Sequence, residues 1–173
     1  MVDDLTRKVQ TSQTGFEALV SRLPGFGGYK DKEQRREADK LLRLHVARRF
    51  AEQLSRLGDI QREVTDLGDF KTMMVLERAV MKLQLLIDRL KTASYGYAGL
   101  FDALKVDEDV LDRLYAFDLQ MLDGVERVSS LLEAMSKGLS IDQSLMQEAR
   151  ELVNELESLN NLFSRRQDVI LGE

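Results

Sequence analysis

The 173-residue chain has no cysteine and no tryptophan, and it contains a single proline. Without cysteine there is no disulfide framework, no thiolate metal site and no cysteine nucleophile. Apolar residues make up 43% of the chain and charged residues 32%, a balance typical of a helical protein rather than of a disordered chain. We therefore expect an all-α fold, and a reducing compartment is compatible with it.

Long apolar runs are also missing from the sequence. Nowhere do about 18 apolar residues follow one another, so no segment is expected to cross a membrane. The chain begins with the acidic Met-Val-Asp-Asp, and no apolar core of a secretory signal follows it. These absences predict a cytoplasmic protein.

Histidine occurs once, and this limits the chemistry that the chain can carry. Di-iron helical bundles use Glu-x-x-His motifs, but the residue three positions before His45 is Leu42. No phosphate-binding glycine loop and no strained nucleophile turn is present either. We expect a non-enzymatic protein without a cofactor, in which His45 lies at the border of the core.

What the sequence does contain is a long stripe of apolar residues between positions 38 and 90, recurring mostly in steps of three and four. This spacing keeps one face of a helix turned toward a partner surface. The segment 31–93 is predicted to form a helical hairpin that is the central element of the fold. The predicted core positions are Leu42, Val46, Phe50, Leu54, Leu57, Ile60, Val64, Leu67, Phe70, Met74, Leu76, Val80, Leu83, Ile87 and Leu90.

The turn of this hairpin has two candidate positions, because Leu-Gly-Asp occurs at 57–59 and again at 67–69. In each copy the glycine can end a helix and the aspartate can cap the next one. We favour Gly68, which leaves Gly58 as a kink and starts the next helix at Phe70. If neither glycine turns the chain, the segment forms one rod-like helix more than ~80 Å long.

Three further segments complete the predicted fold. Residues 1–23 read as an N-terminal helix that ends at Pro24, and residues 107–168 read as a second helical hairpin divided near Gly138. No linker is long or biased enough to separate domains. The prediction is a single domain, 1–173, folded as an antiparallel helical bundle of four to five long helices.

Two loops rich in glycine and aromatic residues supply the candidate site, one at 23–29 and one at 94–101. If short connections make successive helices antiparallel, both loops lie at the same end of the bundle. They either cap the core or form a partner-binding surface, since tyrosine and arginine are common where proteins dock. The candidate partner-binding residues are Phe26, Tyr29, Arg35, Arg36, Tyr95, Tyr97 and Phe101.

Charged segments offer two alternatives. The basic run from Lys30 to Arg49 could touch an anionic membrane surface, although interleaved acids weaken its field and favour a solvated helix face. A cluster of carboxylates could hold a divalent cation, although most of its positions suit helix starts and solvated faces. Its members are Asp102, Asp107, Glu108, Asp109, Asp112, Asp118, Asp123 and Glu126.

The function favoured by these patterns is protein–protein interaction or self-association. The apolar stripes of the first and last predicted helices are narrow, as in seams that a single neighbour covers. A homo-oligomer or a protein partner is therefore expected, with membrane-surface scaffolding and carboxylate-based metal binding as alternatives. The net charge of −5 argues against nucleic acid as the partner.

Overall fold

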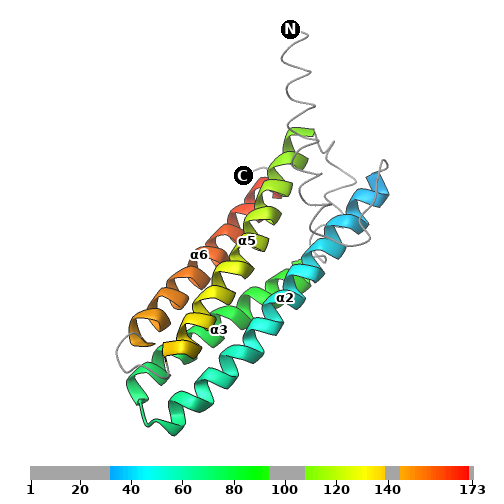
Figure 1. The fold of residues 1–173 in the computed structure, drawn as a ribbon. Coiled ribbons are helices and arrows are strands. Elements are labelled where there is room, and N and C mark those ends of the chain that lie inside the picture. The colour runs from blue at the N-terminus through cyan, green and yellow to red at the C-terminus, as the bar shows by residue number, and fades with distance from the viewer. Residues whose placement is uncertain (1–31, 94–107, 139–144, 172–173) are drawn as a thin grey trace.

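The computed structural model describes residues 32–93, 108–138 and 145–171, and these residues form four helices that pack against each other (Figure 1). The helices are α2 (Lys32–Asp66), α3 (Phe70–Thr92), α5 (Glu108–Gly138) and α6 (Leu145–Leu171). The prediction of an all-α protein is confirmed. The predicted N-terminal helix, 1–23, lies outside the described residues.

The chain breaks between α2 and α3 at residues 67–69, the second of the two Leu-Gly-Asp sequences. Gly68 has a φ of 72°, a left-handed conformation that side chains with a Cβ rarely adopt. Asp69 then caps α3, because its carboxylate accepts a hydrogen bond from the backbone N–H of Thr72 at 3.1 Å. The prediction of the break at Gly68 is confirmed, and the alternative of a single rod-like helix is wrong. Gly58 lies inside α2.

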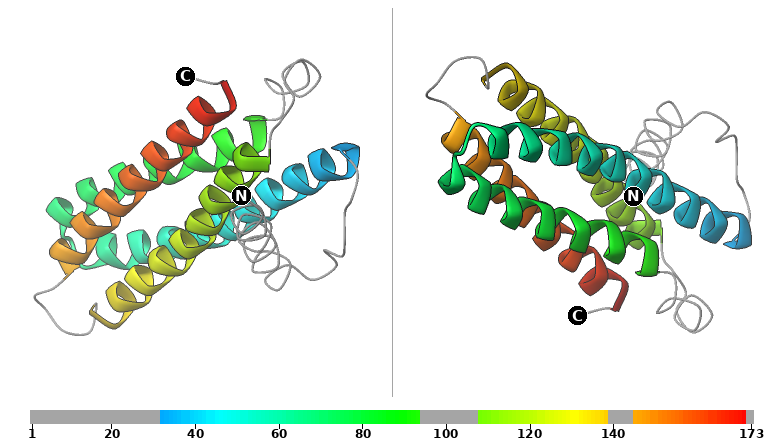
Figure 2. Two further views of the ribbon diagram at one scale, coloured as in Figure 1. Left: turned by 90° about the horizontal axis from the view of Figure 1, so that it is seen from above. Right: turned by 90° about the horizontal axis from the view of Figure 1, so that it is seen from below.

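The four helices form a closed ring. α2 packs against α3 and α5, and α6 packs against the same two helices (Figures 1 and 2). α3 and α5 therefore lie across the ring from each other. The core inside the ring is aliphatic, with two phenylalanines, and its fully buried members include Phe50, Leu57, Leu76, Leu83, Met121, Leu132, Leu152 and Phe163.

Pairs of contacting side chains show how the helices are aligned. Between α2 and α5, Arg49 pairs with Glu126 and Arg56 hydrogen-bonds to Ser129, so residue numbers rise together and these helices run in the same direction. Between α5 and α6 the order is reversed, because Arg127 pairs with Glu155 whereas the earlier Asp118 pairs with the later Arg166.

The same-direction contact recurs on the other side of the ring. Lys82 of α3 pairs with Glu157 of α6, and Arg89 hydrogen-bonds to Ser164. The starts of α2 and α5 and the ends of α3 and α6 accordingly lie at the same end of the molecule (Figure 2). The pair α2 and α3 thus lies beside the pair α5 and α6. α2 packs against α5, and α3 packs against α6.

The predicted core stripe is correct for most of α2 and α3 but wrong around the turn. Leu67, Phe70 and Met74 were expected inside, yet 64%, 76% and 68% of their surfaces are exposed. The prediction carried one stripe straight through the turn. The break at Gly68 lets α3 turn a different face inward, the one that carries Leu76 and Leu83, so Phe70 and Met74 lie outside, and Leu67 lies in the turn itself.

The glycine at the turn and the glycine inside α2 should respond oppositely to alanine. At Gly68 the positive φ makes alanine strained, and we expect Gly68→Ala to lower the free energy of unfolding by about 1 kcal/mol. At Gly58 an added Cβ meets no atom within 4 Å, so Gly58→Ala should raise it by up to about 1 kcal/mol. Urea unfolding of both variants measures the two effects, and equal signs would contradict the assignment of the turn.

The cap at Asp69 makes part of the stability depend on pH. Hydrogen bonds from the hydroxyl and the backbone N–H of Thr72 lower the pKa of Asp69 below its ordinary value of 3.8. A carboxyl with a lowered pKa in the folded state stabilises the protein above its ordinary pKa, and this contribution is lost as pH falls through the folded-state pKa. Asp69→Ala should therefore cost about 1 kcal/mol at pH 7 and less at pH 3.

The matched control for this variant is Asp66→Ala, which removes a carboxylate on the other side of the turn, at the last residue of α2. Asp66 begins no helix, so its replacement should change the urea midpoint little at either pH. A cost for Asp69→Ala that stays constant from pH 7 to pH 3 would contradict the capping role.

Candidate functional site

All seven residues of the predicted partner-binding site lie outside the described side chains. Phe26, Tyr29, Tyr95, Tyr97 and Phe101 belong to segments that the structure does not describe, and Arg35 and Arg36 lie in the first turns of α2, where only the backbone is described. The start of α2 and the end of α3, which come nearest in sequence to the two predicted loops, lie at the same end of the ring (Figure 2). The choice between a core cap and a binding surface stays a prediction.

The predicted carboxylate cluster is described only in part. Asp118 is buried in α5, Glu126 is exposed and pairs with Arg49, and Asp123 is exposed. The expectation that most of these acids suit helix starts and solvated faces does not hold for Asp118, which is buried. Among the side chains that the structure describes, no group of three or more histidine and acidic residues is arranged to hold a metal ion.

His45 is half-buried on α2, as expected for a residue at the border of the core. Its Nδ1 lies 3.4 Å from an amino group of Arg48. Burial, and then the positive charges of Arg48 and Arg49, lower the pKa of His45 below its ordinary value. The carboxylate of Glu52 acts in the opposite direction and only partly offsets them, so the neutral imidazole is favoured.

A buried ion pair joins α5 to α6. The Nε of Arg166 donates to Asp118 Oδ1 at 2.9 Å, and the two side chains are 1% and 6% exposed. Burial of both charges requires close pairing, because each would otherwise lose its hydration without compensation. The sequence-based prediction missed this pair, since the two residues are far apart in sequence and only folding brings them together. The pair fixes the alignment of two helices.

A second polar link joins α3 to α6 through Arg89. Its guanidinium donates to the backbone carbonyl of Asn160 at 2.9 Å and to the hydroxyl of Ser164 at 2.8 Å, and lies over the ring of Phe163. The side-chain amide of Asn160 donates back to the carbonyl of Lys82 at 3.1 Å. These contacts set the register of α3 against α6.

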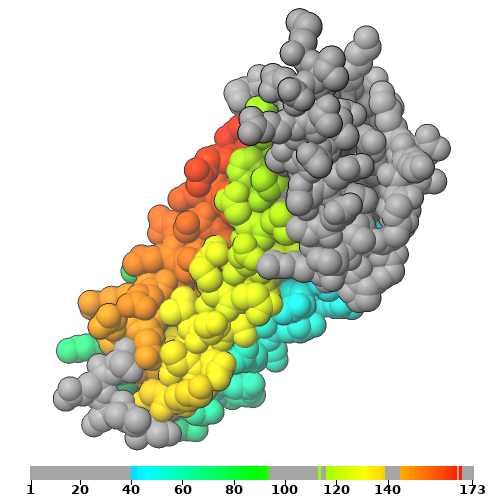
Figure 3. All heavy atoms as spheres, turned by 45° about the horizontal axis from the view of Figure 1, so that its top comes forward, coloured from blue at the N-terminus to red at the C-terminus, as the bar shows by residue number. Residues whose placement is uncertain are grey.

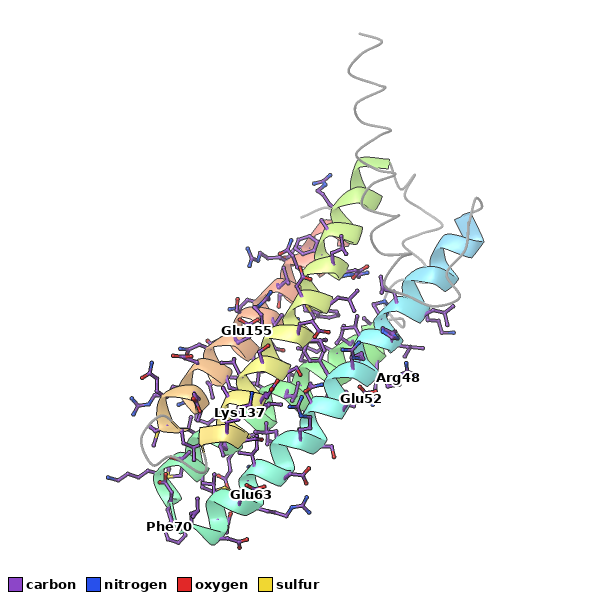
Figure 4. The ribbon with its side chains drawn as sticks, in the orientation of Figure 1. Arg48, Glu52, Glu63, Phe70, Lys137 and Glu155 are labelled. Atoms are coloured by element: carbon purple, nitrogen blue, oxygen red, sulfur yellow. The ribbon has the colours of Figure 1, made fainter. Side chains whose placement is uncertain are left out.

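The surface feature that these internal links leave unexplained is a row of large apolar side chains on the outside of α3. Phe70, Met74, Met81 and Leu85 are 76%, 68%, 61% and 52% exposed. At about 100° of rotation per residue they lie within one third of the helix circumference. We call these four residues the outer stripe of α3. Figure 4 shows Phe70 at the end of the bundle where α2 and α3 are joined.

The outer stripe lies opposite the face by which α3 packs into the core. That inner face carries Leu76, Ala79, Leu83, Leu86 and Leu90, all buried. One helix thus has two apolar faces, and only one of them is covered by α2 and α6. The sequence contains a signal for this second apolar face. The step from Met74 to Leu76 in the predicted core stripe is only two residues. Met81 and Leu85 are not three or four residues away from any member of that stripe.

Two charges divide the outer stripe in the middle. Glu77 and Arg78 are exposed and lie between Met74 and Met81 on the same side of the helix. Within the part of the chain that the structure describes, neither has an ion-pair partner. The outer stripe is therefore two apolar pairs of side chains around an acid and a base. None of the described helices has the length and apolar character needed to cross a membrane.

The buried pair should contribute far more to stability than a surface pair. Asp118→Asn keeps the size of the side chain but removes the charge that faces the buried Arg166, and we expect a loss of about 3 kcal/mol or more. The control is Arg127→Gln, which removes the more exposed pair with Glu155 between the same helices and should cost under ~1 kcal/mol. Urea unfolding at pH 7 compares them, and similar losses would contradict a structural role specific to Asp118.

Comparison with known proteins adds no family to this description. No protein-family model, no curated protein and no solved structure matches the chain. The surface chemistry of the described helices is therefore the basis on which a function is argued.

Proposed function

We propose that this chain is a non-enzymatic helical protein that acts by binding protein, and that the outer stripe of α3 is its contact surface. The observation that carries the proposal is the exposure of Phe70, Met74, Met81 and Leu85 on one side of one helix. Single exposed apolar residues are ordinary on soluble proteins, but contiguous patches of large ones mark interaction sites. Methionine and phenylalanine are also enriched at protein interfaces.

The composition of the chain supports a binding role over catalysis. There is no cysteine, and the pKa of the single histidine, which lies beside Arg48, is lowered. The polar groups that are buried, such as Asp118 and Arg166, join helices to each other. In this proposal the apolar core and the few buried polar links hold the bundle together, and the function lies on its outer surface.

The proposed architecture of the whole chain is a single domain of two antiparallel hairpins, 31–93 and 107–168, with residues 1–23 as a fifth helix. The three-residue connection at 67–69 and the reversed order of pairs between α5 and α6 support it. The alternative functions, membrane-surface binding by the basic segment and metal binding by carboxylates, have no comparable supporting observation among the described residues.

The proposal predicts which surface touches another protein in cells that contain the natural partners. A photo-crosslinking benzoylphenylalanine at Met81 should capture a discrete protein, which mass spectrometry then identifies. The control position is Ser136, which is exposed on α5, across the ring from α3. In Figure 3, α5 lies on the face turned to the viewer, whereas most of α3 is hidden behind it. Capture at Ser136 but not at Met81 would refute the proposed surface.

A further inference from the structure

We infer that Met74 and Met81 form an oxidation site on the outside of α3, where hydrogen peroxide converts both thioethers to sulfoxides. Their oxidation makes the outer stripe polar while the bundle stays folded. The inference rests on the proposed function only for its consequence, because a polar stripe would weaken the contact proposed above. The site itself follows from where the chain places its methionines.

The methionines of the described helices differ sharply in exposure. Met74 and Met81 are 68% and 61% exposed, whereas Met121 and Met135 of α5 are fully buried in the core. Oxidation requires the oxidant to reach the sulfur atom, and close packing keeps small molecules out of a protein interior. The two exposed side chains should therefore react well before the two buried ones.

Met73 is the sequence neighbour of Met74 but has a different environment. Its side chain is partly buried against the core, and its sulfur accepts a hydrogen bond from the hydroxyl of Thr65 at 3.6 Å. This hydrogen bond engages a sulfur lone pair, the group of electrons that must attack the peroxide. Met73 should therefore react more slowly than Met74, and the two adjacent residues form a matched pair within one chain.

The reaction is a two-electron oxidation of sulfur. A lone pair of the thioether attacks one oxygen of hydrogen peroxide, an S–O bond forms and the O–O bond breaks. The sulfur is oxidised to the sulfoxide, and the peroxide is reduced to water. The product is polar where the thioether was apolar, and methionine sulfoxide reductases return it to the thioether.

The bundle should tolerate this change because neither reacting side chain belongs to the core. A sulfoxide oxygen that points into water keeps its hydrogen bonds to solvent, so oxidation of Met74 and Met81 creates no buried polar group. Oxidation of Met121 or Met135 would instead place a polar oxygen in the core. The position of the oxidised methionine thus decides whether the surface or the fold is affected.

The outer stripe loses its apolar character along most of its length. Glu77 and Arg78 lie exposed between the two methionines, so sulfoxides at both positions make the outer face polar from residue 74 to residue 81. Phe70 and Leu85 remain apolar, but they are fifteen residues and ~22 Å apart along the helix. Two separate side chains then replace one apolar surface.

A time course of oxidation tests the site with the purified full-length chain. Hydrogen peroxide is added to the folded protein, samples are quenched, and tandem mass spectrometry measures the sulfoxide at each methionine. Met74 and Met81 should react at least roughly tenfold faster than Met121 and Met135, with Met73 slower than Met74. Equal rates at the exposed and the buried positions overturn the inference, and so do equal rates at Met73 and Met74.

Hydrophobic-interaction chromatography on a phenyl resin measures the change of the surface. The chain oxidised at Met74 and Met81 should elute earlier than the untreated chain, and its midpoint in urea unfolding should stay the same. The matched control is the double variant M74L/M81L, whose leucines cannot be oxidised and whose retention should not change with peroxide. A fall in the urea midpoint, or an equal shift in the control, overturns the inference.

The failure of this inference differs from the failure of the proposed function. A benzoylphenylalanine at Leu85 leaves both methionines in place, and the purified chain is oxidised before it is mixed with cell extract. If Leu85 captures nothing even without peroxide while Met74 and Met81 still oxidise first, the oxidation site is correct and the proposed surface is wrong.

If Leu85 captures a protein, oxidation should reduce the capture at least roughly fivefold, because the sulfoxides lose water when they are covered. The same treatment of M74L/M81L should leave the capture at the level of its own untreated sample. Capture that ignores oxidation in the original chain overturns the proposed consequence, although the contact surface itself stands.

Discussion

Neither pair of helices in this protein can bury its apolar stripe without the other. α2 and α3 turn Phe50, Leu57 and Leu83 toward the same interior that receives Leu132 and Leu152 from α5 and α6. Two helices alone leave most of such a stripe in water, whereas four in a closed ring enclose it. The fold therefore depends on the contact between the two pairs, and the turn at Gly68 serves this contact by setting which face of α3 turns inward.

Polar side chains help to set how the pair α2 and α3 is aligned along the pair α5 and α6. On one side of the ring Arg56 donates to Gln53 of its own helix and to Ser129 of α5. On the other side Arg89 reaches Asn160 and Ser164 of α6. A shift of one pair along the other would leave these partly buried donors without their acceptors, which is costly. The packed core also resists such a shift, and the arginines add directional contacts that only one alignment satisfies.

The outer stripe of α3 has no comparable role inside the molecule. Its four side chains do not contribute to the buried core, and their exposure to water gives nothing to the stability of the single chain. An apolar surface of this kind is explained by a contact that covers it.

The sequence by itself determined the helical class and most of the inner stripe, and it limited the turn to Gly58 or Gly68, of which Gly68 was favoured. These features are local: a three- and four-residue period, a glycine that accepts a positive φ, and an aspartate that caps the helix after it. The candidate site was predicted on two loops and the start of α2, where the structure describes no side chains, and the proposed surface on α3 was not among the predicted sites.

Only the tertiary structure decided which helices are neighbours, that Asp118 is buried against Arg166, and that Met74 and Phe70 point outward. Periodicity reports that a helix has an apolar face, but when a helix has two such faces it does not report which one meets the core. That choice depends on the positions of the other helices, since α2 and α6 can cover only one side of α3. The uncovered side is the surface to which the proposed function is assigned.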